Sequence, residues 1–182
     1  MIRFDSVACR RGGRLLFEGL DLAVAGGEAV HVAGPNGCGK SSLLRLAAGL
    51  LAPAAGSIAR DAAVALADDS LALDRERTLG EALGWWARID RAATALAAFR
   101  LADLAAVPVR YLSTGQARRA RLARVAASGA PLWLLDEPLN GLDAPSSTML
   151  IEAIAQHRER GGAVIAASHV PLGDGWRTLA LA

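Results

Sequence analysis

The chain has 182 residues, of which 53% are hydrophobic, and a formal net charge of +2. This composition allows a single domain with a sizeable core, and so weak a positive charge gives no ground for nucleic-acid binding. Two cysteines, Cys9 and Cys38, make no Cys-x-x-Cys motif, so we expect a reducing compartment rather than a disulfide framework. We find no signal-peptide pattern and no apolar run of about 18 residues, and therefore expect no membrane span.

The first third of the chain predicts strands followed by a loop and a helix. Residues 2–24 alternate in the manner of short strands, with a turn at residues 10–14. An apolar run at residues 29–33 predicts a buried strand, and the glycine-rich residues 34–39 predict a loop. Leucine spacing over residues 41–51 predicts a helix.

The middle of the chain is rich in Ala and Leu and predicts helices. Residues 79–106 have the spacing of two or three helices, and residues 116–127 have that of another. Apolar strands are expected at residues 132–135 and 163–167, with a helix over residues 146–160 between them. Apolar strands that alternate with helices indicate an α/β fold with a parallel sheet covered on both faces.

The glycine-rich loop has the spacing of a phosphate-binding loop. It reads Gly34-Pro35-Asn36-Gly37-Cys38-Gly39-Lys40-Ser41, followed by Ser42, and fits the pattern G-x-x-x-x-G-K-[ST]. Backbone N–H groups of such a loop and the N-terminus of the following helix surround phosphate oxygens. Lys40, the only lysine of the chain, is expected to reach the β- and γ-phosphates of ATP, and the Ser41 hydroxyl to bind Mg²⁺. The alternative is a chance match, which the flanking strand and helix disfavour.

Two acidic residues follow the predicted strand at residues 132–135. Because nucleotides sit at the carboxyl ends of parallel strands, Asp136 is expected to hold Mg²⁺, directly or through water. Glu137 is expected to polarise the attacking water as a general base. A solvated turn after a strand is the alternative interpretation.

A third motif precedes the helix at residues 116–127. Ser113 and Gln116 have the spacing of a capping box, which would merely start that helix. The whole segment Leu112-Ser113-Thr114-Gly115-Gln116, however, resembles the signature sequence of the ATP-binding-cassette (ABC) family. Leu139-Asn140-Gly141-Leu142-Asp143 resembles the D-loop of that family, and Ser168-His169 resembles its switch histidine.

The resemblance implies a P-loop NTPase fold of the ABC cassette type. It has a mostly parallel core sheet, an N-terminal antiparallel β subdomain and an inserted helical lobe. We expect the core at about residues 1–67 and 129–182 and the lobe at about residues 68–128.

The resemblance also implies a head-to-tail homodimer with ATP sandwiched between the chains. Each ATP would lie between the phosphate loop of one chain and the signature helix of the other, where Ser113, Gly115 and Gln116 face the γ-phosphate. His169 would hydrogen-bond that phosphate, and Asp143 would shape the dimer contact. The alternative interpretation of His169 is that it merely caps the end of the preceding strand.

The chain departs from the family pattern at two places. Where many cassettes carry an aromatic residue that stacks on adenine, residues 9–13 contain none, and Arg11 is the candidate that could stack instead. Where cassettes carry a glutamine after a strand, here expected at residues 64–67, the chain has Asp68 and Asp69, either of which is a candidate Mg²⁺ ligand.

Several segments are similar to one subfamily, the ATP-binding subunit of the haem exporter of cytochrome c biogenesis. They are residues 81–87, 107–110, 116–124, 161–165 and 168–172. This resemblance implies integral membrane permease subunits as partners and a peripheral position on the cytoplasmic face of the inner membrane. Trp85 and Trp86 would pack inside the lobe or lie against a permease.

Other functions remain open at this point. The chain would alternatively serve another small ABC exporter, or act as a nucleotide-gated cassette with weak hydrolysis because the glutamine is missing. A soluble cassette linked to translation usually has tandem cassettes or coiled-coil insertions, and neither is present. Arg118, Arg121 and Arg124 form one helical stripe, which we interpret as a solvated or acid-paired face rather than a nucleic-acid surface.

Overall fold

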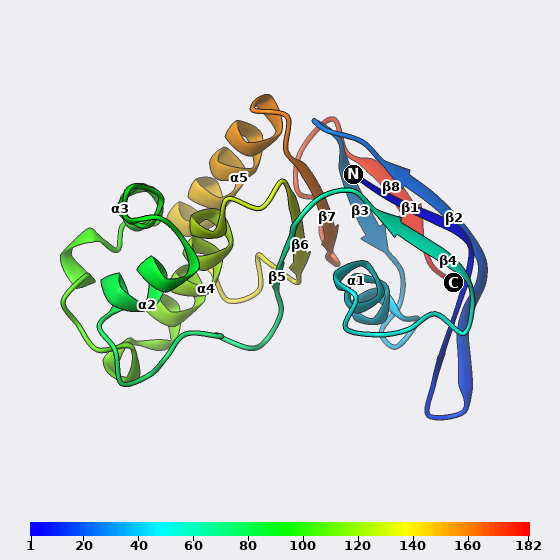
Figure 1. Ribbon diagram of the computed structural model, residues 1–182, viewed down its shortest axis with the longest axis horizontal. Helices are drawn as coiled ribbons and strands as arrows, with labels where there is room; N and C mark the ends of the chain where they lie inside the picture. The colour runs from blue at the N-terminus through cyan, green and yellow to red at the C-terminus, as the bar shows by residue number, and fades with distance from the viewer. The chain divides into compact units, whose positions relative to one another are not determined.

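A three-stranded antiparallel sheet forms the first layer of the computed structural model, which describes the backbone of residues 1–182 and all side chains except those of residues 89 and 90. Its strands are β1 (Ile2–Arg11), β2 (Arg14–Val24) and β4 (Ala55–Arg60), in the order β2-β1-β4 (Figure 1). The expectation of short strands is wrong, because Gly12 and Gly13 adopt positive φ angles of 53° and 80° and join two long strands in a tight hairpin.

A five-stranded parallel sheet forms the second layer and confirms the expected α/β fold. The strands lie in the order β5-β6-β7-β3-β8 and pair in parallel throughout. They are β3 (Ala29–Ala33), β5 (Val64–Ala67), β6 (Leu132–Asp136), β7 (Ala163–Ala167) and β8 (Arg177–Ala180). The three central strands are almost wholly buried, as strands covered on both faces must be.

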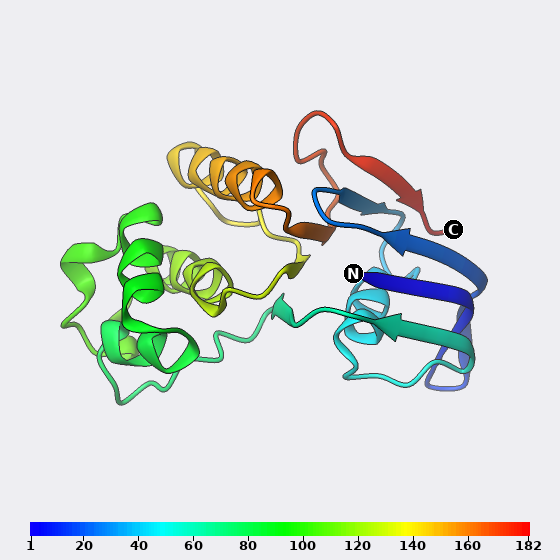
Figure 2. The ribbon, with the colours of Figure 1, turned by 45° about the horizontal axis from the view of Figure 1, so that its top comes forward.

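Helix α1 (Lys40–Ala48), the cyan helix in Figure 2, contributes to a core that both sheets share. Leu43, Leu44 and Leu46 of α1 pack in one cluster with apolar side chains from β1, β3, β6 and β7. Each buried leucine stabilises the fold by about 1.5–3 kcal/mol. The helix ends earlier than residue 51, because Gly49 adopts a left-handed conformation (φ 75°) that caps it.

The side chains of β6 point to the two faces of the sheet, and His157, near the end of α5 (Ala144–Glu159), lies on the face away from α1. Side chains of a strand alternate between its faces, so Leu132 and Leu134 join the cluster around α1 whereas Trp133 points the other way. The Trp133 ring stacks on His157 of α5, with 3.9 Å between the ring centroids and 12° between the planes. Desolvation lowers the pKa of His157 below its usual value.

The chain divides into two compact units, which we describe separately. The first comprises Met1–Asp68, Pro131–Pro138 and His157–Ala182, and the second comprises Asp69–Ala130 and Leu139–Gln156. The sequence analysis assigned residues 139–156 to the core, whereas they group here with the helical segment. The division into a core at about residues 1–67 and 129–182 and a lobe at about residues 68–128 therefore stays a proposal.

The second unit is helical. It contains α2 (Leu79–Trp86), α3 (Ile89–Ala98), the short 3₁₀ helices η1 (Ala102–Leu104) and η2 (Val109–Tyr111), α4 (Thr114–Ser128) and most of α5. Within the part of the chain that the structure describes, no helix combines the length and apolarity needed to cross a bilayer.

The arginine stripe on α4 is not the solvated face that the sequence suggested. Arg124 is only 5% exposed, and its guanidinium lies 4.9 Å from the centroid of the Trp86 ring. Arg118 donates a hydrogen bond to the carbonyl oxygen of Gly141 at 2.8 Å. Because these side chains pack against the helical unit itself, a freely solvated face is wrong for this helix.

Candidate functional site

The loop from Gly34 to Gly39 connects β3 to α1 and has the backbone of a tight phosphate cradle. Gly34 has a φ of 153°, and a Cβ at this residue would lie 2.4 Å from the carbonyl oxygen of Leu181 and 2.7 Å from Sγ of Cys38. No side chain fits there, so the first glycine of the motif is required by the close approach of the chain. Cys38 is buried in the loop, whereas Pro35, Asn36 and Gly37 are exposed.

Helix α1 begins at Lys40 without a capping side chain. Its N-cap is Gly39, with φ 113°, and the first helical hydrogen bond is donated by the Leu43 amide to the Gly39 carbonyl at 2.8 Å. The amides of Lys40, Ser41 and Ser42 therefore belong to an uncapped first turn, where the helix dipole favours an anion. By contrast, capping boxes satisfy the first turns of α2 and α4.

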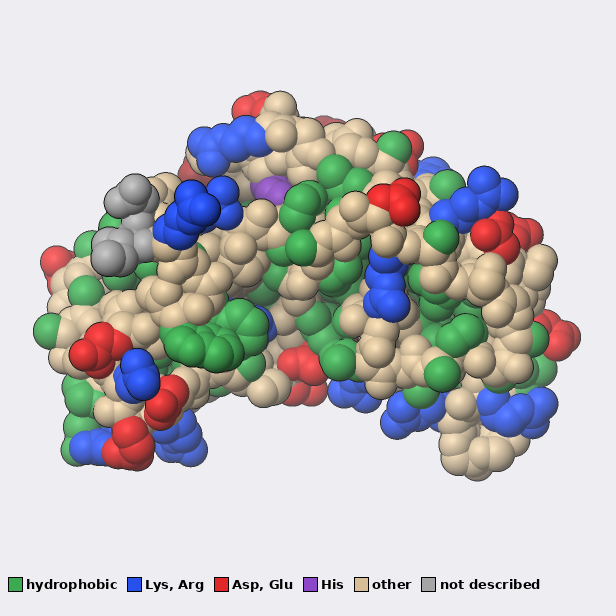
Figure 3. All heavy atoms as spheres, viewed as in Figure 1, with side chains coloured by type: hydrophobic (Ala, Val, Ile, Leu, Met, Phe, Trp, Pro, Cys, Tyr) green, Lys and Arg blue, Asp and Glu red, His purple; other side chains and the backbone are tan. Residues whose placement is uncertain are grey.

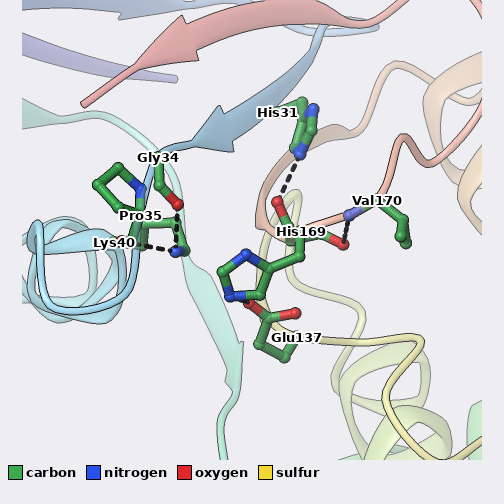
Figure 4. A network of polar contacts seen from close by, with 8 residues as sticks. His31, Gly34, Pro35, Lys40, Glu137, His169 and Val170 are labelled. Carbon is green, nitrogen blue, oxygen red and sulfur yellow. Dashed lines mark hydrogen bonds and ion pairs between the residues drawn. The ribbon is translucent and has the colours of Figure 1, made fainter. Parts of the chain in front are cut away.

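Lys40 lies over the loop that precedes it. Its Nζ donates hydrogen bonds to the carbonyl oxygens of Gly34 at 2.7 Å and Pro35 at 3.1 Å (Figure 4), and the residue is 7% exposed. An ammonium group has three N–H donors, so one remains for a ligand that enters the loop. The positive charge is thus held at the mouth of the uncapped helix.

Glu137 follows directly on the last residue of β6 and has an unusual backbone. Its φ is 45°, in the left-handed region, although it is not a glycine and precedes Pro138. Its amide donates to the Ala167 carbonyl at 2.8 Å, which fixes the residue beside the end of β7. Such a conformation costs about 1–3 kcal/mol and is found preferentially at functional sites.

His169 lies against Glu137. Its Nε2 is 3.3 Å from Oε1 of Glu137, and the two side chains are 49% and 25% exposed (Figure 4). The two residues follow β6 and β7, which are neighbours in the sheet. The structure thus brings together the two residues for which the sequence predicted catalytic roles.

The predicted metal ligands Asp136 and Asp68 end adjacent strands. The register of β5 against β6 pairs Ala67 with Leu135, so Asp68 and Asp136 follow at the same edge of the sheet. Neighbouring strands are about 4.8 Å apart. Asp68 therefore occupies a position beside Asp136, whereas Asp69 lies in the second unit.

The residues present suit a magnesium ion that is bound together with phosphates. No three His, Cys, Asp or Glu side chains among those described gather into a metal site by themselves. Mg²⁺ usually needs only one or two protein oxygens, because phosphates and water complete its octahedron. The Ser41 hydroxyl and the Asp136 carboxylate would supply such hard oxygen ligands.

The signature residues form the N-terminus of α4, in the second unit. Oγ of Ser113 accepts a hydrogen bond from the Gln116 amide at 3.3 Å, and Oε1 of Gln116 accepts one from the Ser113 amide at 2.8 Å. The capping box considered as an alternative is therefore real. It does not exclude the other role, because the O–H of Ser113 keeps its own proton to donate.

Asp143 caps α5, a role that the sequence analysis did not assign. Its carboxylate accepts a hydrogen bond from the Ser146 amide at 2.9 Å. Hydrogen bonds from the Ser146 side chain and backbone lower the pKa of Asp143 below its usual value, so the cap stays ionised at neutral pH. The residue is exposed, so a contact with a second chain remains compatible with the cap.

An aromatic residue beside the loop was missed. Arg11 ends β1 and is exposed, as its predicted role requires. Phe17 of β2, however, pairs with Cys9 of β1, and its ring is 3.1 Å from where a Cβ of Gly39 would lie. Only the register of the hairpin places Phe17 beside the loop, so the local sequence gave no signal for it.

The fold matches solved structures over nearly the whole chain. A putative ABC transporter ATP-binding protein from Pyrococcus furiosus is 22% identical and has a TM-score of 0.85, over 99% of this chain and 96% of that one. A chain described as the ATP binding subunit of an ABC transporter is 23% identical and also has a TM-score of 0.85, over 93% and 79% of the two chains. These likenesses establish the fold.

Sequence comparison establishes the family. The family described as ABC transporter matches residues 17–140, so the chain is an ATPase of the ABC transporter class. The cytochrome c biogenesis ATP-binding export protein CcmA of Novosphingobium aromaticivorans is 61% identical over 96% of this chain and 92% of that protein. Its namesake in Sphingopyxis alaskensis is 54% identical over 94% and 91%. The chain therefore belongs to the family of cytochrome c biogenesis ATP-binding export proteins.

Proposed function

We propose that this chain binds Mg·ATP in the loop at residues 34–41 and hydrolyses it to drive a haem exporter used in cytochrome c biogenesis. The contact between Glu137 and His169, 3.3 Å apart where β6 and β7 end, carries the catalytic part of the proposal. The 61% identity to a named export protein supports the transport part. The partners would be integral membrane permeases, and the chain would sit peripherally on the cytoplasmic face of the inner membrane.

Each residue of the site has a separate role in the proposed hydrolysis. Lys40 and the uncapped amides of α1 hold the phosphates and neutralise charge that grows in the transition state. Mg²⁺ held by Ser41 and Asp136 would supply further charge neutralisation. Glu137 accepts a proton from the attacking water, and its fixed backbone aims the carboxylate before substrate arrives. His169 can donate to Glu137 and to a phosphate together only as the imidazolium, which has two N–H groups.

Gly115 supports the proposal that a second chain closes over the nucleotide. It lies exposed in the first turn of α4, and a Cβ there would meet no atom within 4 Å other than those of its chain neighbours and of the backbone of its own helix. A glycine costs a helix up to about 1 kcal/mol relative to alanine. Since nothing within the chain requires this glycine, we attribute it to close approach by a ligand or a second protomer.

Gly115→Ala is therefore expected to separate folding from function. Thermal unfolding of the variant should occur at the wild-type temperature or a few degrees above it, because alanine favours the helix. ATP-dependent dimerisation and turnover should fall at least about tenfold. Circular dichroism and light scattering measure the two effects. Wild-type dimerisation in this variant would contradict the proposed role of the signature helix.

An apolar surface on the helical unit is the proposed permease contact. Trp85 is 73% exposed, and its ring packs edge-on against Trp86, with centroids 4.9 Å apart. Nε1 of Trp86 donates to the Ala72 carbonyl at 3.1 Å, which anchors the pair. Figure 3 shows hydrophobic side chains gathered on this unit among charged ones. A cavity of about 300 Å³ is lined by Ala72, Leu73, Asp74, Arg77, Ala82, Trp85 and Trp86.

Trp85→Ala is expected to leave the ATPase rate of the isolated chain unchanged and to weaken its assembly with the permease. Loss of an exposed aromatic anchor commonly costs an interface about 2 kcal/mol or more, which is roughly 30-fold in affinity. Co-purification with the membrane subunits and haem staining of c-type cytochromes in cells measure the effect. Ile151→Ala, at an exposed side chain of α5, serves as the matched control. Normal assembly and normal cytochromes in Trp85→Ala would contradict the proposed contact.

A cassette that binds ATP but scarcely hydrolyses it is the second candidate, since the usual glutamine is absent. The register that brings Asp68 beside Asp136 speaks against it, because an oxygen ligand is available at that edge. Steady-state hydrolysis by the purified chain, with and without permease, distinguishes the two.

A further inference from the structure

His31 is a buried histidine in the middle of β3, and the mechanism above does not use it. It is 9% exposed and stands among apolar neighbours in the run Ala29–Ala33. Its Nε2 lies 2.8 Å from the carbonyl oxygen of Ser168 (Figure 4). Because a carbonyl oxygen can only accept, the ring nitrogen must donate, and this fixes the tautomer of His31.

Ser168 is the residue that immediately precedes His169, and it is held at three points. Its carbonyl accepts from His31, and its amide donates to the Val32 carbonyl at 3.4 Å. Its Oγ accepts a hydrogen bond from the Val170 amide at 3.2 Å. The peptide before His169 is therefore held through the Ser168 carbonyl, and the peptide after it through the Val170 amide. Ser168 is 2% exposed, so water does not replace these bonds.

We propose that His31 is a positioning residue for the ATPase reaction. The carbonyl that His31 holds belongs to the peptide bond between Ser168 and His169. Fixing that peptide fixes the direction of the His169 side chain just beyond the end of β7, and with it the 3.3 Å contact to Glu137. The inference rests on the proposed function, in which Glu137 and His169 act on the γ-phosphate.

The strand that carries His31 also leads into the phosphate loop. Val32 and Ala33 follow it, and Gly34 begins the loop. His31 pairs in register with Ala166 of β7, so one side chain spans the two strands that lead to the loop before Lys40 and to His169. The bond thus sets the phosphate loop and the switch histidine relative to each other within one compact unit.

The test compares two replacements of His31 with a matched control elsewhere. His31→Leu fills the same buried space without a donor, whereas His31→Gln keeps an N–H that can reach the carbonyl. His157→Leu is the control, because His157 also hydrogen-bonds a backbone carbonyl, that of Pro131 at 3.1 Å. For each folded variant, kcat, the KM for ATP and the thermal unfolding temperature are measured.

We expect His31→Leu to lower kcat on the order of tenfold to a hundredfold with KM within about twofold of wild type, because displacement of a reacting group costs rate rather than affinity. His31→Gln should recover most of kcat. His157→Leu should lower the unfolding temperature and leave kcat unchanged. An unaltered kcat in folded His31→Leu, or equal losses in His31→Leu and His31→Gln, would overturn the proposal.

A double-mutant cycle with His169→Ala separates this inference from the function on which it rests. If His31 acts through His169, His31→Leu has no further effect on kcat in the His169→Ala background. Multiplicative losses would contradict the role of His31 alone. A wild-type rate in His169→Ala itself would contradict the proposed role of the switch histidine.

Discussion

Replacing Glu137 with glutamine is expected to lower the steady-state rate of ATP hydrolysis about a hundredfold or more. A general base contributes roughly 10²- to 10⁴-fold to rate, and an amide cannot accept the proton of the attacking water. The fold should be unaffected, since glutamine adopts the same left-handed backbone (φ 45°) at the same cost. Phosphate release under saturating Mg·ATP measures the loss, and binding of a fluorescent ATP analogue shows that the site still loads.

Glu152→Gln provides the control for Glu137→Gln. Glu152 is an exposed carboxylate on α5, so the change in net charge is the same without a change at the site. Turnover in this variant should match the wild type. If Glu137→Gln also turned over at the wild-type rate, another group would be the base and the mechanism proposed here would be wrong.

Lys40→Ala is expected to have the second large effect, which is a loss of affinity for Mg·ATP. The ammonium lies at the mouth of the phosphate loop, 2.7 Å from the Gly34 carbonyl oxygen, and is held there by that oxygen and that of Pro35. Loss of a hydrogen bond to a charged group costs about 1.5–3 kcal/mol, which weakens ATP binding about 10- to 150-fold. Isothermal titration with Mg·ATP measures the affinity, and turnover should fall with it.

Lys40→Arg tests whether charge alone is sufficient. The planar guanidinium is larger than an ammonium and presents its donors in a fixed fork, so it does not reproduce the contacts that the buried Lys40 side chain makes with the loop. We expect it to recover less than half of the binding free energy lost in Lys40→Ala. Wild-type affinity for Mg·ATP in Lys40→Ala would contradict the assignment of residues 34–41 as the phosphate loop.

The elements that the sequence predicted well are those whose signal is local. Five consecutive apolar residues gave β7 at the expected residues, Ala163–Ala167, and a glycine loop before leucine-spaced residues placed the start of α1 within one residue. The capping box of Ser113 and Gln116 followed from spacing alone. Periodicity and capping act over a few residues, so one sequence is enough to recognise them.

The elements that were missed depend on pairing between distant residues. β4 (Ala55–Arg60) and β8 (Arg177–Ala180) are edge strands with mostly exposed side chains, so neither shows an apolar run. They become strands because the neighbouring strand offers free backbone partners. The interpretation of the arginine stripe as a solvated face was wrong for the same reason, because only the tertiary fold places Trp86 against Arg124.

In the site, too, local sequence features could be predicted, whereas features that depend on distant residues could not. The types and spacing of Lys40, Asp136 and Glu137 suggested phosphate chemistry from the sequence alone. The left-handed backbone of Glu137 could not be foreseen, because a residue before proline ordinarily prefers an extended conformation. The bond from His31 to Ser168 joins residues 137 positions apart and becomes visible only when β3 and β7 pair.

The association state of Glu137→Gln in the presence of Mg·ATP tests the central claim most directly. If ATP is bound by the loop at residues 34–41 and covered by the signature helix of a second protomer, a variant that cannot hydrolyse it should accumulate as a dimer. Sedimentation equilibrium should then give twice the chain mass of 18.8 kDa with ATP and the monomer mass without it. A monomer at saturating ATP, with nucleotide bound, would contradict the account.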